Sequence, residues 1–398
     1  MLSNTLAFFR NKQFISIGFL FAVGSLMLGI WVAALPAIKE RLAFTDAILG
    51  LSLLLAPAGS FTGVFLAPKI FSKIKVGQWL LTGPFILCMG YTLQVVATKP
   101  WMFWLALYVT GLSGFLNGVS TNAVVTLIEQ RSGTRIMSTC HGMYSLGGGI
   151  SAGLAVVFYL LHVPDYLQML LVFSIIAMVI ISIKKLLLQY NEHIHADTGL
   201  AAPPLSILGL SLICFVIFMA EGCVADWSAI YLKESLHSSV TWAGLGFAGF
   251  SVMMAISRFN GDALVPKIGA KKVVVAGSLL AALGFLLVVA APAPWLAITG
   301  FTIVGIGCSC IVPILINAAA IVPGVSPVIG ISAVFSGGLI GFLTGPSVIG
   351  ILSEKFNLSI GLSFVLLLCI LAAIAAMQNR YLINSTTHLN QANYNEPI

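Results

Sequence analysis

Charged residues are scarce in this 398-residue sequence. Asp, Glu, Lys and Arg make up 8% of it, whereas an ordinary soluble domain carries about 25%. Apolar residues account for 59%. This balance excludes a soluble globular enzyme, a disordered chain and a nucleic-acid-binding protein. Most of the chain is therefore expected to lie in the lipid bilayer, where a helix satisfies its own backbone hydrogen bonds and a loop does not.

Signatures of catalysis and of cofactor binding are scarce as well. The sequence has no HExxH motif, no Walker motif and no pair of aspartates within an apolar segment. Its cysteines are odd in number and lie in apolar stretches, so we expect no disulfide framework and no metal site. We expect a chain that is not an enzyme and uses no cofactor. The cysteines are Cys88, Cys140, Cys214, Cys223, Cys308, Cys310 and Cys369.

Long apolar runs dominate what is present. A membrane-spanning helix needs roughly 20 apolar residues, and the ten-residue alternating segments of a membrane barrel are absent from the sequence. The runs predict an all-α integral membrane protein with twelve transmembrane helices. The predicted spans are about 14–38, 47–68, 77–98, 101–128, 137–162, 166–188, 206–231, 241–264, 272–292, 295–321, 328–353 and 359–382.

The basic residues predict how the chain is oriented. With the N-terminus inside, 14 of the 19 Lys and Arg residues fall on the cytoplasmic side and five on the outer side. Cytoplasmic loops carry an excess of Lys and Arg, so we expect both termini to be cytoplasmic. The longest polar segment divides the spans six and six. It predicts an N-terminal bundle at 1–189, an inter-bundle loop at 190–205, a C-terminal bundle at 206–383 and a polar tail at 384–398.

The two halves of the chain repeat each other. At a constant offset of 194 positions, several short strings match in loops as well as in spans. Two related six-helix halves imply a pseudo-symmetric pair, which places a solute site between the halves near the middle of the membrane. The matches are Lys39-Glu40 with Lys233-Glu234, Gly50-Leu51 with Gly244-Leu245, and Lys73-Ile74 with Lys267-Ile268.

Twelve spans in two related halves resemble the major facilitator superfamily. The string Gly261-Asp262-Ala-Leu-Val-Pro-Lys267-Ile-Gly269-Ala-Lys271-Lys272 is similar to the signature cytoplasmic loop of that superfamily. Three further strings resemble its fucose-permease-like branch of bacterial inner-membrane carriers. They are Asn122-Ala123 leading through Met137-Ser138 to Gly147, Ala220-Glu221-Gly222 with Asp226-Trp227, and Gly345-Pro346. The resemblance implies two pseudo-symmetric six-helix bundles in a bacterial inner membrane, with one chain functional as a monomer.

The resemblance also implies a set of gating and latch residues. Asp262, with Arg258 and Lys267, corresponds to the latch between spans 8 and 9. Glu129, Arg131 and Arg135 lie in the expected inner loop between spans 4 and 5 and are interpreted as gating or orientation charges. The matching loop of the first half, Gly63-Val-Phe-Leu-Ala-Pro68-Lys69, lacks the acid of the signature.

One departure from the branch concerns the proton carrier. Its sugar–proton symporters carry an acid on span 1 and another on span 4, but here span 1 has no acid and the span-4 position is Gly118. Three other residues are candidates for proton coupling. Glu221 lies near mid-span, where an ionisable residue is expensive and functional by default, or it is a structural glutamate that ties span 7 to a neighbour. Asp226 is either a second carrier or an anchor near a helix end. His141 could share a proton with an acid, or bond to a backbone carbonyl.

Spans 1, 4, 5, 7, 10 and 11 line the central cavity of this fold. Aromatic faces with amide groups suit a sugar-like or mixed polar and apolar solute, although packing is an alternative for each aromatic ring. Lys and Arg are missing from the middle of the spans, apart from Arg258 near an inner end, and anion carriers need a fixed cation. The solute is therefore expected to be neutral, zwitterionic or cationic. The cavity candidates are Trp31, Asn117, Asn122, Tyr144, Trp227, Asn317 and Phe335.

These observations predict a secondary active transporter of a small solute that works by alternating access and is driven by protons. The alternative is a proton antiporter that exports an amphipathic drug or a secondary metabolite. Gly345-Pro346 faintly resembles the glycine–proline motif of antiporters, although that motif belongs on span 5. In energised vesicles of one orientation, the direction in which the solute accumulates distinguishes uptake from export.

Overall fold

The computed structural model describes residues 8–134, 136–190, 192–193 and 205–382, with backbone only at 138, 262–263 and 327–328. In this part of the chain, 12 helices are long and apolar enough to cross a membrane. All twelve predicted spans are confirmed, with ends that differ by a few residues. The fold is all-α, as predicted, and no strand occurs in the described ranges.

Six spans form the first half. The second of them consists of α3 and α4, which follow each other with a single intervening residue, Leu54. The elements are α2 (Lys12–Arg41), α3 (Asp46–Leu53), α4 (Leu55–Phe71), α5 (Val76–Val96), α6 (Pro100–Ser132), α7 (Met137–Leu160) and α8 (Asp165–Leu187).

Six spans also form the second half. α9 continues into the π-helical turn η1, and two of the spans are each built from two consecutive helices. The elements are α9 (Leu208–Ile230), η1 (Tyr231–Ser235), α10 (Val240–Ala243), α11 (Leu245–Ile268), α12 (Ala270–Val289), α13 (Pro294–Cys308), α14 (Ile311–Ala320), α15 (Pro327–Lys355) and α16 (Leu358–Gln378).

Local sequence sets the helix boundaries. Asn11 caps α2, because its side-chain oxygen accepts a hydrogen bond from the backbone N–H of Gln13 at 2.9 Å. Pro100 occupies the first position of α6, where the missing N–H costs nothing. Gly133 ends the same helix with a φ of 67°, a left-handed conformation that suits glycine.

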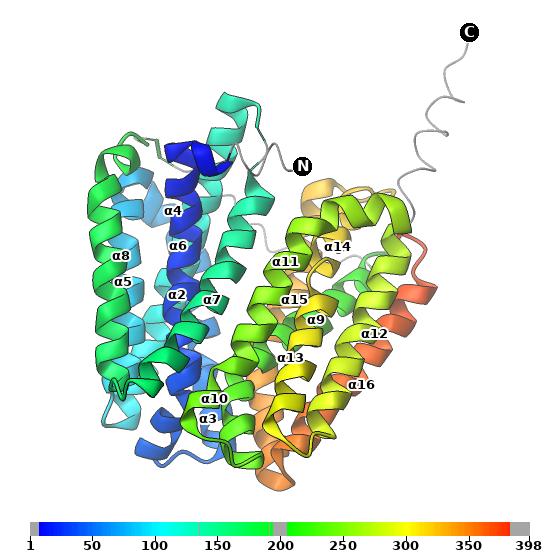
Figure 1. The fold of residues 1–398 in the computed structure, drawn as a ribbon. Coiled ribbons are helices and arrows are strands. Elements are labelled where there is room, and N and C mark those ends of the chain that lie inside the picture. The colour runs from blue at the N-terminus through cyan, green and yellow to red at the C-terminus, as the bar shows by residue number, and fades with distance from the viewer. Residues whose placement is uncertain (1–7, 135, 191, 194–204, 383–398) are drawn as a thin grey trace.

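The halves stand side by side in Figure 1, with α2 to α8 on one side and α9 to α16 on the other. The start of α2 and the end of α16 lie at one end of the molecule, which we call the terminal end; α3 and α10 lie at the other, the α3–α10 end. The predicted domain boundaries stay a prediction, because much of the predicted loop and the tail from residue 383 lie outside the described residues.

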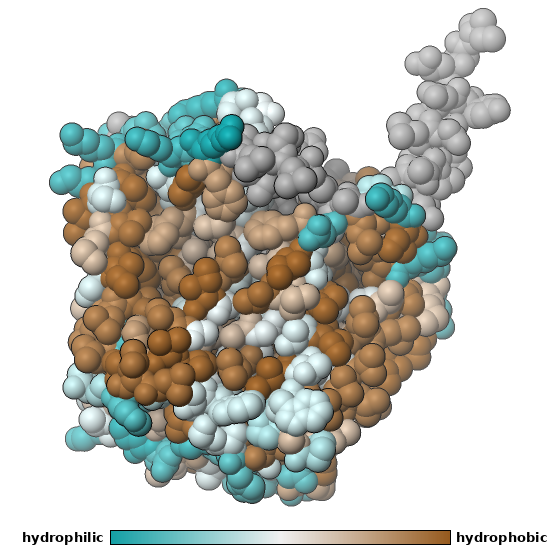
Figure 2. All heavy atoms as spheres, viewed as in Figure 1, coloured by the Kyte–Doolittle hydropathy of each residue, from teal (hydrophilic) through white to brown (hydrophobic). Residues whose placement is uncertain are grey.

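The surface suits a bilayer. On the face shown in Figure 2, apolar residues form a band across the middle, and hydrophilic residues gather at both ends. Large apolar side chains of the spans are exposed, among them Leu105, Met178 and Leu371. A soluble protein would bury such side chains, whereas lipid tails solvate them.

Close helix packing relies on glycine at a few positions. A Cβ added at Gly284 on α12 would lie 2.6 Å from the backbone oxygen of Gly300 on α13, and the converse holds for Gly300. Gly341 on α15 approaches the backbone of Phe215 on α9 in the same way. Lipid tails are as apolar as the helices, so the hydrophobic effect does not drive the helices together. Small residues let the helices approach closely enough for van der Waals contacts to stabilise the packing.

Candidate functional site

An ion pair lies at the centre of the molecule. Arg258 Nη2 on α11 lies 3.4 Å from Glu221 Oε1 on α9, and both side chains are mostly buried. Glu221 lies near the middle of its span, 13 residues after Leu208 and 14 before Ser235. The Arg258 side chain reaches it from a position 18 residues after Val240, where its own span begins. The pair is therefore well inside the hydrocarbon layer, where pairing offsets the cost of each charge.

Arg258 also joins the two halves of the molecule. Its Nη1 donates a hydrogen bond to Ser145 Oγ on α7 at 3.0 Å, and its Nε donates to the backbone oxygen of Ser309 at 3.2 Å. These contacts differ from the latch role predicted for Arg258. The long side chain extends toward Glu221 and away from the loop after α11, because a buried carboxylate offers a stronger partner than that loop. Hence the middle of the membrane does contain a cation, with its charge balanced by Glu221.

His141 and Tyr144 line the first-half side of this site. Both are exposed on α7, although α7 packs within the bundle, and they lie one turn apart. Ser145, which accepts the hydrogen bond from Arg258, directly follows Tyr144 and lies one turn after His141 on α7. The His141 ring packs edge-on against Phe21, with ring centroids 5.2 Å apart, and has no hydrogen-bond partner among the described residues. The structure thus places His141 and Tyr144 within one turn of the residue through which Arg258 contacts α7.

Asp226 lies within the span, four residues before Ile230, at which α9 ends and η1 follows directly. It is five residues beyond Glu221 on α9, which places it about 7.5 Å nearer the α3–α10 end. Its two interpretations, as a second proton carrier and as an anchor near a helix end, both stay predictions.

The remaining cavity candidates divide into paired and unpaired groups. Asn117 Oδ1 accepts a hydrogen bond from Trp79 Nε1 at 3.0 Å, within the first half. Asn122 Nδ2 donates to the backbone oxygen of Gly118, one turn back on its own helix, at 2.8 Å. The other candidates are either unpartnered within the described residues or exposed. Trp31 and Trp227 are buried with unpartnered indole N–H groups, and Phe335 and Asn317 are exposed.

The α3–α10 end is closed by reciprocal ion pairs. Lys39 Nζ lies 2.6 Å from Glu234 Oε2, and Lys233 Nζ lies 2.8 Å from Glu40 Oε2. The two Lys-Glu dipeptides that reveal the sequence repeat thus bind each other across the molecule. Lys39 also pairs with Asp46 at 2.5 Å. Sequence reasoning identified the repeat but did not assign these residues a contact, although their matched positions carried the signal.

Further contacts between the halves lie at the same end. Ser347 Oγ donates to the backbone oxygen of Gly50 at 3.0 Å, and Ser353 donates to Asp46. Among the described residues, every side-chain hydrogen bond between the halves lies at this end or at Arg258. These bonds therefore hold the halves together at the α3–α10 end, and no such bond joins the described parts of the halves at the terminal end.

The predicted gating charges serve the first half and the loop that follows it. Glu129 Oε1 accepts hydrogen bonds from the backbone N–H groups of Ile136 and Met137, at 2.6 and 2.9 Å, and so fixes the start of α7. Arg131 pairs with Glu192 beyond α8. Lys267 is exposed and makes no ion pair among the described residues. Arg135 and the side chain of Asp262 lie outside the described residues, so their latch roles stay predictions.

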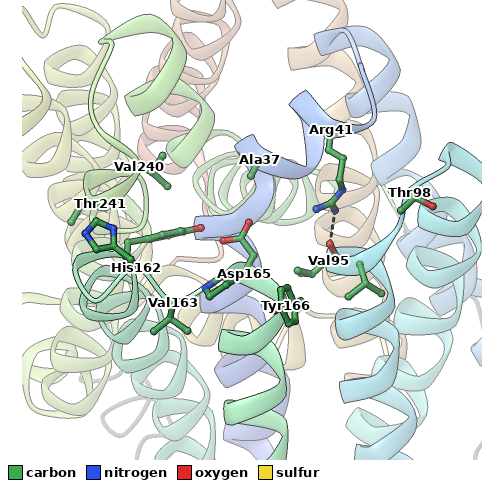
Figure 3. Close-up of a pocket in the computed structure, with 13 residues that line it drawn as sticks. Ala37, Arg41, Val95, Thr98, His162, Val163, Asp165, Tyr166, Val240 and Thr241 are labelled. Atoms are coloured by element: carbon green, nitrogen blue, oxygen red, sulfur yellow. Dashed lines mark hydrogen bonds between the residues drawn. The ribbon is translucent and has the colours of Figure 1, made fainter.

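A surface pocket of about 790 Å³ lies elsewhere, at the α3–α10 end (Figure 3). It is formed by the end of α2, the end of α5, the α7–α8 turn and α10. Arg41 lines it, but its guanidinium is occupied by the backbone oxygens of Val95 and Ala97, which end α5. In this view Asp165 lies between His162 and Arg41. The pocket is remote from Glu221 and is not the central site.

One short string has the spacing of a hydrolase nucleophile motif, Gly149-Ile-Ser151-Ala-Gly153. That motif requires a sharp turn between a strand and a helix. Here Ser151 lies within α7, is buried, and donates a hydrogen bond to the backbone oxygen of Ser25 at 3.1 Å. Its role is to join α7 to α2.

Comparisons with known proteins agree with this architecture. The model of the Major Facilitator Superfamily matches residues 210–387. An uncharacterized MFS-type transporter of Yersinia pestis is 30% identical over 365 residues, which cover 92% of this chain and 95% of the relative. Membrane protein MosC of Rhizobium meliloti is 27% identical over 369 residues, which cover 91% of this chain and 89% of the relative.

Solved structures share the fold at low sequence identity. The nucleoside transporter NupG superposes with a TM-score of 0.64 at 16% identity, covering 92% of this chain and 98% of that one. A bacterial homolog of the human lysosomal transporter Spinster, in an inward-facing and unoccupied conformation, gives a TM-score of 0.66 at 15% identity, covering 92% and 96%.

Proposed function

The chain belongs to the major facilitator superfamily and is a transporter of that family, and from this premise we propose that it is a secondary transporter that moves a small neutral, zwitterionic or cationic solute together with protons. The observation that carries the proposal is the contact of Glu221 with Arg258, which in turn binds Ser145 of the other half.

The pair supplies a means of coupling. While Glu221 is ionised, its charge compensates that of Arg258. In this arrangement Arg258 also binds Ser145 on α7. Protonation of Glu221 removes the negative charge and leaves Arg258 without its ionic partner. Because a buried unpaired charge is costly, the halves then rearrange, and the proton taken up on one side is released on the other. His141, one turn from Ser145, is a further group through which that proton can pass.

The charge balance supports the solute class. The Glu221–Arg258 pair is neutral as a whole, and Asp226 adds one carboxylate to the same path. A multiply charged anion would meet no unpaired cation among the described residues of the site. NupG is a nucleoside transporter, and a nucleoside is a neutral example of the class proposed here.

The direction of access follows from the closed end. If the terminal end is cytoplasmic, as the basic residues predict, the closed α3–α10 end faces outward and the structure is in an inward-facing state. This orientation corresponds to a multi-pass protein of the bacterial inner membrane with cytoplasmic termini. The reciprocal pairs of Lys39 and Lys233 then form the outer gate of an alternating-access cycle.

The test is flux in proteoliposomes of one orientation that contain a pH dye. Pools of sugars, nucleosides, amino acids and cationic drugs are added, and solute movement and proton movement are recorded together. Saturable solute flux accompanied by protons is the expected result. Flux in the direction opposite to the proton would identify the export alternative, and flux without protons would refute coupling.

A further inference from the structure

A second cluster of polar and aromatic side chains lies between the Glu221–Arg258 pair and the closed end. It consists of Asp226 on α9, Trp31 on α2 and Tyr91 on α5, and we call it the Asp226 subsite. The bond between Lys39 and Glu234 fixes the register of two segments that run in the same direction. Trp31 precedes Lys39 by eight residues, and Asp226 precedes Glu234 by eight. Both therefore lie about 12 Å from that bond in the direction of the terminal end.

Tyr91 completes the cluster from the first half. Its ring packs edge-on against Trp31, with ring centroids 6.3 Å apart and an interplanar angle of 65°. The helix α2, which carries Trp31, contacts α9, which carries Asp226 at the same depth. Two aromatic residues of the first half therefore lie at the level of a carboxylate of the second.

Asp226 differs from most of the other acids in having no partner. Glu40, Asp46, Glu192, Glu221 and Glu234 form ion pairs. Glu129 and Glu354 accept hydrogen bonds from backbone N–H groups. Among acids whose side chains the structure describes, only Asp226 and Asp165, which lines the surface pocket, form neither an ion pair nor a hydrogen bond. A carboxylate at this depth is expensive, so its retention indicates a partner that comes and goes.

The Trp31 indole gives a second, independent sign of an absent ligand. The side chain is only 3% exposed, and its Nε1–H has no acceptor among the described residues. Buried polar groups are normally paired, and an exception calls for an explanation. An acceptor on a bound solute, such as a hydroxyl, would satisfy it.

We propose that the Asp226 subsite binds an amino group of the transported solute, with Asp226 as its counter-ion and Trp31 and Tyr91 as its aromatic walls. Carboxylates and aromatic faces together attract ammonium groups, the first by charge and the second by the ring quadrupole. This inference rests on the proposed function. It narrows the solute from the neutral, zwitterionic and cationic classes to molecules that carry an amino group. Glu221 and Arg258 keep the coupling role, one and a half turns nearer the terminal end.

The test is binding to the purified full-length protein, with matched pairs of probes. Tyramine is compared with tyrosol, and glucosamine with glucose; the members of each pair differ chiefly by an amino group in place of a hydroxyl. Binding is measured by calorimetry and by the shift of the thermal unfolding midpoint. The variants are Asp226→Asn, the conservative Asp226→Glu, and Asp165→Asn as a control for removing an acid outside the site.

In the native protein, at least one amine is expected to bind tenfold or more tightly than its neutral partner. Asp226→Asn should abolish that preference, Asp226→Glu should retain part of it, and Asp165→Asn should leave it unchanged. Should Asp226→Asn fail to fold, the comparison of native protein with Asp226→Glu still decides the matter, because a displaced carboxylate must weaken amine binding selectively.

Three results would overturn the inference: equal binding of amines and neutral partners, no binding of either amine at millimolar concentration, or a preference that survives Asp226→Asn. Each differs from failure of the proposed function, which would show as absence of proton-linked flux for every solute. Proton-linked transport of a neutral solute would uphold the function and reject the amine subsite.

Discussion

Lys39 and Glu234 are 195 positions apart in the chain and 2.6 Å apart in space. Their partners in the sequence repeat, Glu40 and Lys233, form the reciprocal bond on the neighbouring positions. A dipeptide duplicated with its half thus becomes self-complementary when the halves face each other. This relationship explains how one repeated string can form a gate.

The gate predicts a shift in conformation when Lys39 is neutralised. Lys39→Gln removes the cation that both Asp46 and Glu234 approach, so two carboxylates would remain without it. We expect the population open at the α3–α10 end to rise about fivefold. Distances between spin labels at Leu51 and Ile351, both exposed at that end, would measure it.

The matched control for that variant is Lys355→Gln. Lys355 lies at the same end and makes no ion pair among the described residues, so its distance distribution should match the native one. An unchanged distribution in Lys39→Gln would show that the pairs do not hold the end closed.

The central ion pair predicts non-additive stability. Breaking a buried pair by removing one partner costs about 3–5 kcal/mol, because the other charge is left unpaired. Glu221→Gln and Arg258→Gln should each lower the thermal unfolding midpoint in detergent. The unfolding midpoint of the double variant should fall by less than the sum of the two single-variant decreases. Strictly additive decreases would argue against a direct interaction.

Helix contact through glycine predicts a position-specific cost of one methyl group. Gly284→Ala places a Cβ against the backbone of Gly300 and should destabilise the protein by about 1–3 kcal/mol. Gly153→Ala is the control, because a Cβ there meets nothing within 4 Å. Thermal unfolding midpoints compare them, and equal midpoints for the two variants would contradict the packing of α12 on α13.

The ion pair of Arg131 with Glu192 predicts a pH-dependent contribution to the stability of the protein. A hydrogen bond from the backbone, and then the contact with Arg131, hold the pKa of Glu192 below its ordinary value of 4.5. A lowered folded-state pKa stabilises the protein above the unfolded value, and this contribution is lost as pH falls through the folded pKa. Glu192→Gln should therefore lower the unfolding midpoint slightly at pH 7 and not at pH 3. A difference that persists in acid would exclude the ionic origin.

Much of the fold could be predicted from the sequence because membrane helices follow composition. Each span needs a long apolar run, and a loop within hydrocarbon is forbidden, so all twelve spans are located within a few residues. The halves were visible through strings such as Lys39-Glu40. These signals are local, and a hydropathy pattern records them directly.

The site was harder to predict because side-chain reach and helix rotation are absent from that pattern. Glu221 and His141 were recognised by their cost and chemistry, and Arg258 links the Glu221 carboxylate to Ser145, one turn after His141 on α7. Arg258 was assigned by its distance along the chain from a loop motif, whereas its guanidinium extends to Glu221 and Ser145. Tyr91 gave no signal, since one tyrosine in an apolar run is ordinary until Trp31 and Asp226 are placed beside it.

The most direct test of the central claim compares two modes of transport by Glu221→Gln in proteoliposomes. One mode is uphill accumulation driven by a proton gradient, and the other is exchange of labelled for unlabelled solute without a gradient. We expect the variant to lose proton-driven accumulation at least tenfold while exchange continues. Accumulation at the native level in Glu221→Gln would contradict it and would make Glu221 a structural residue.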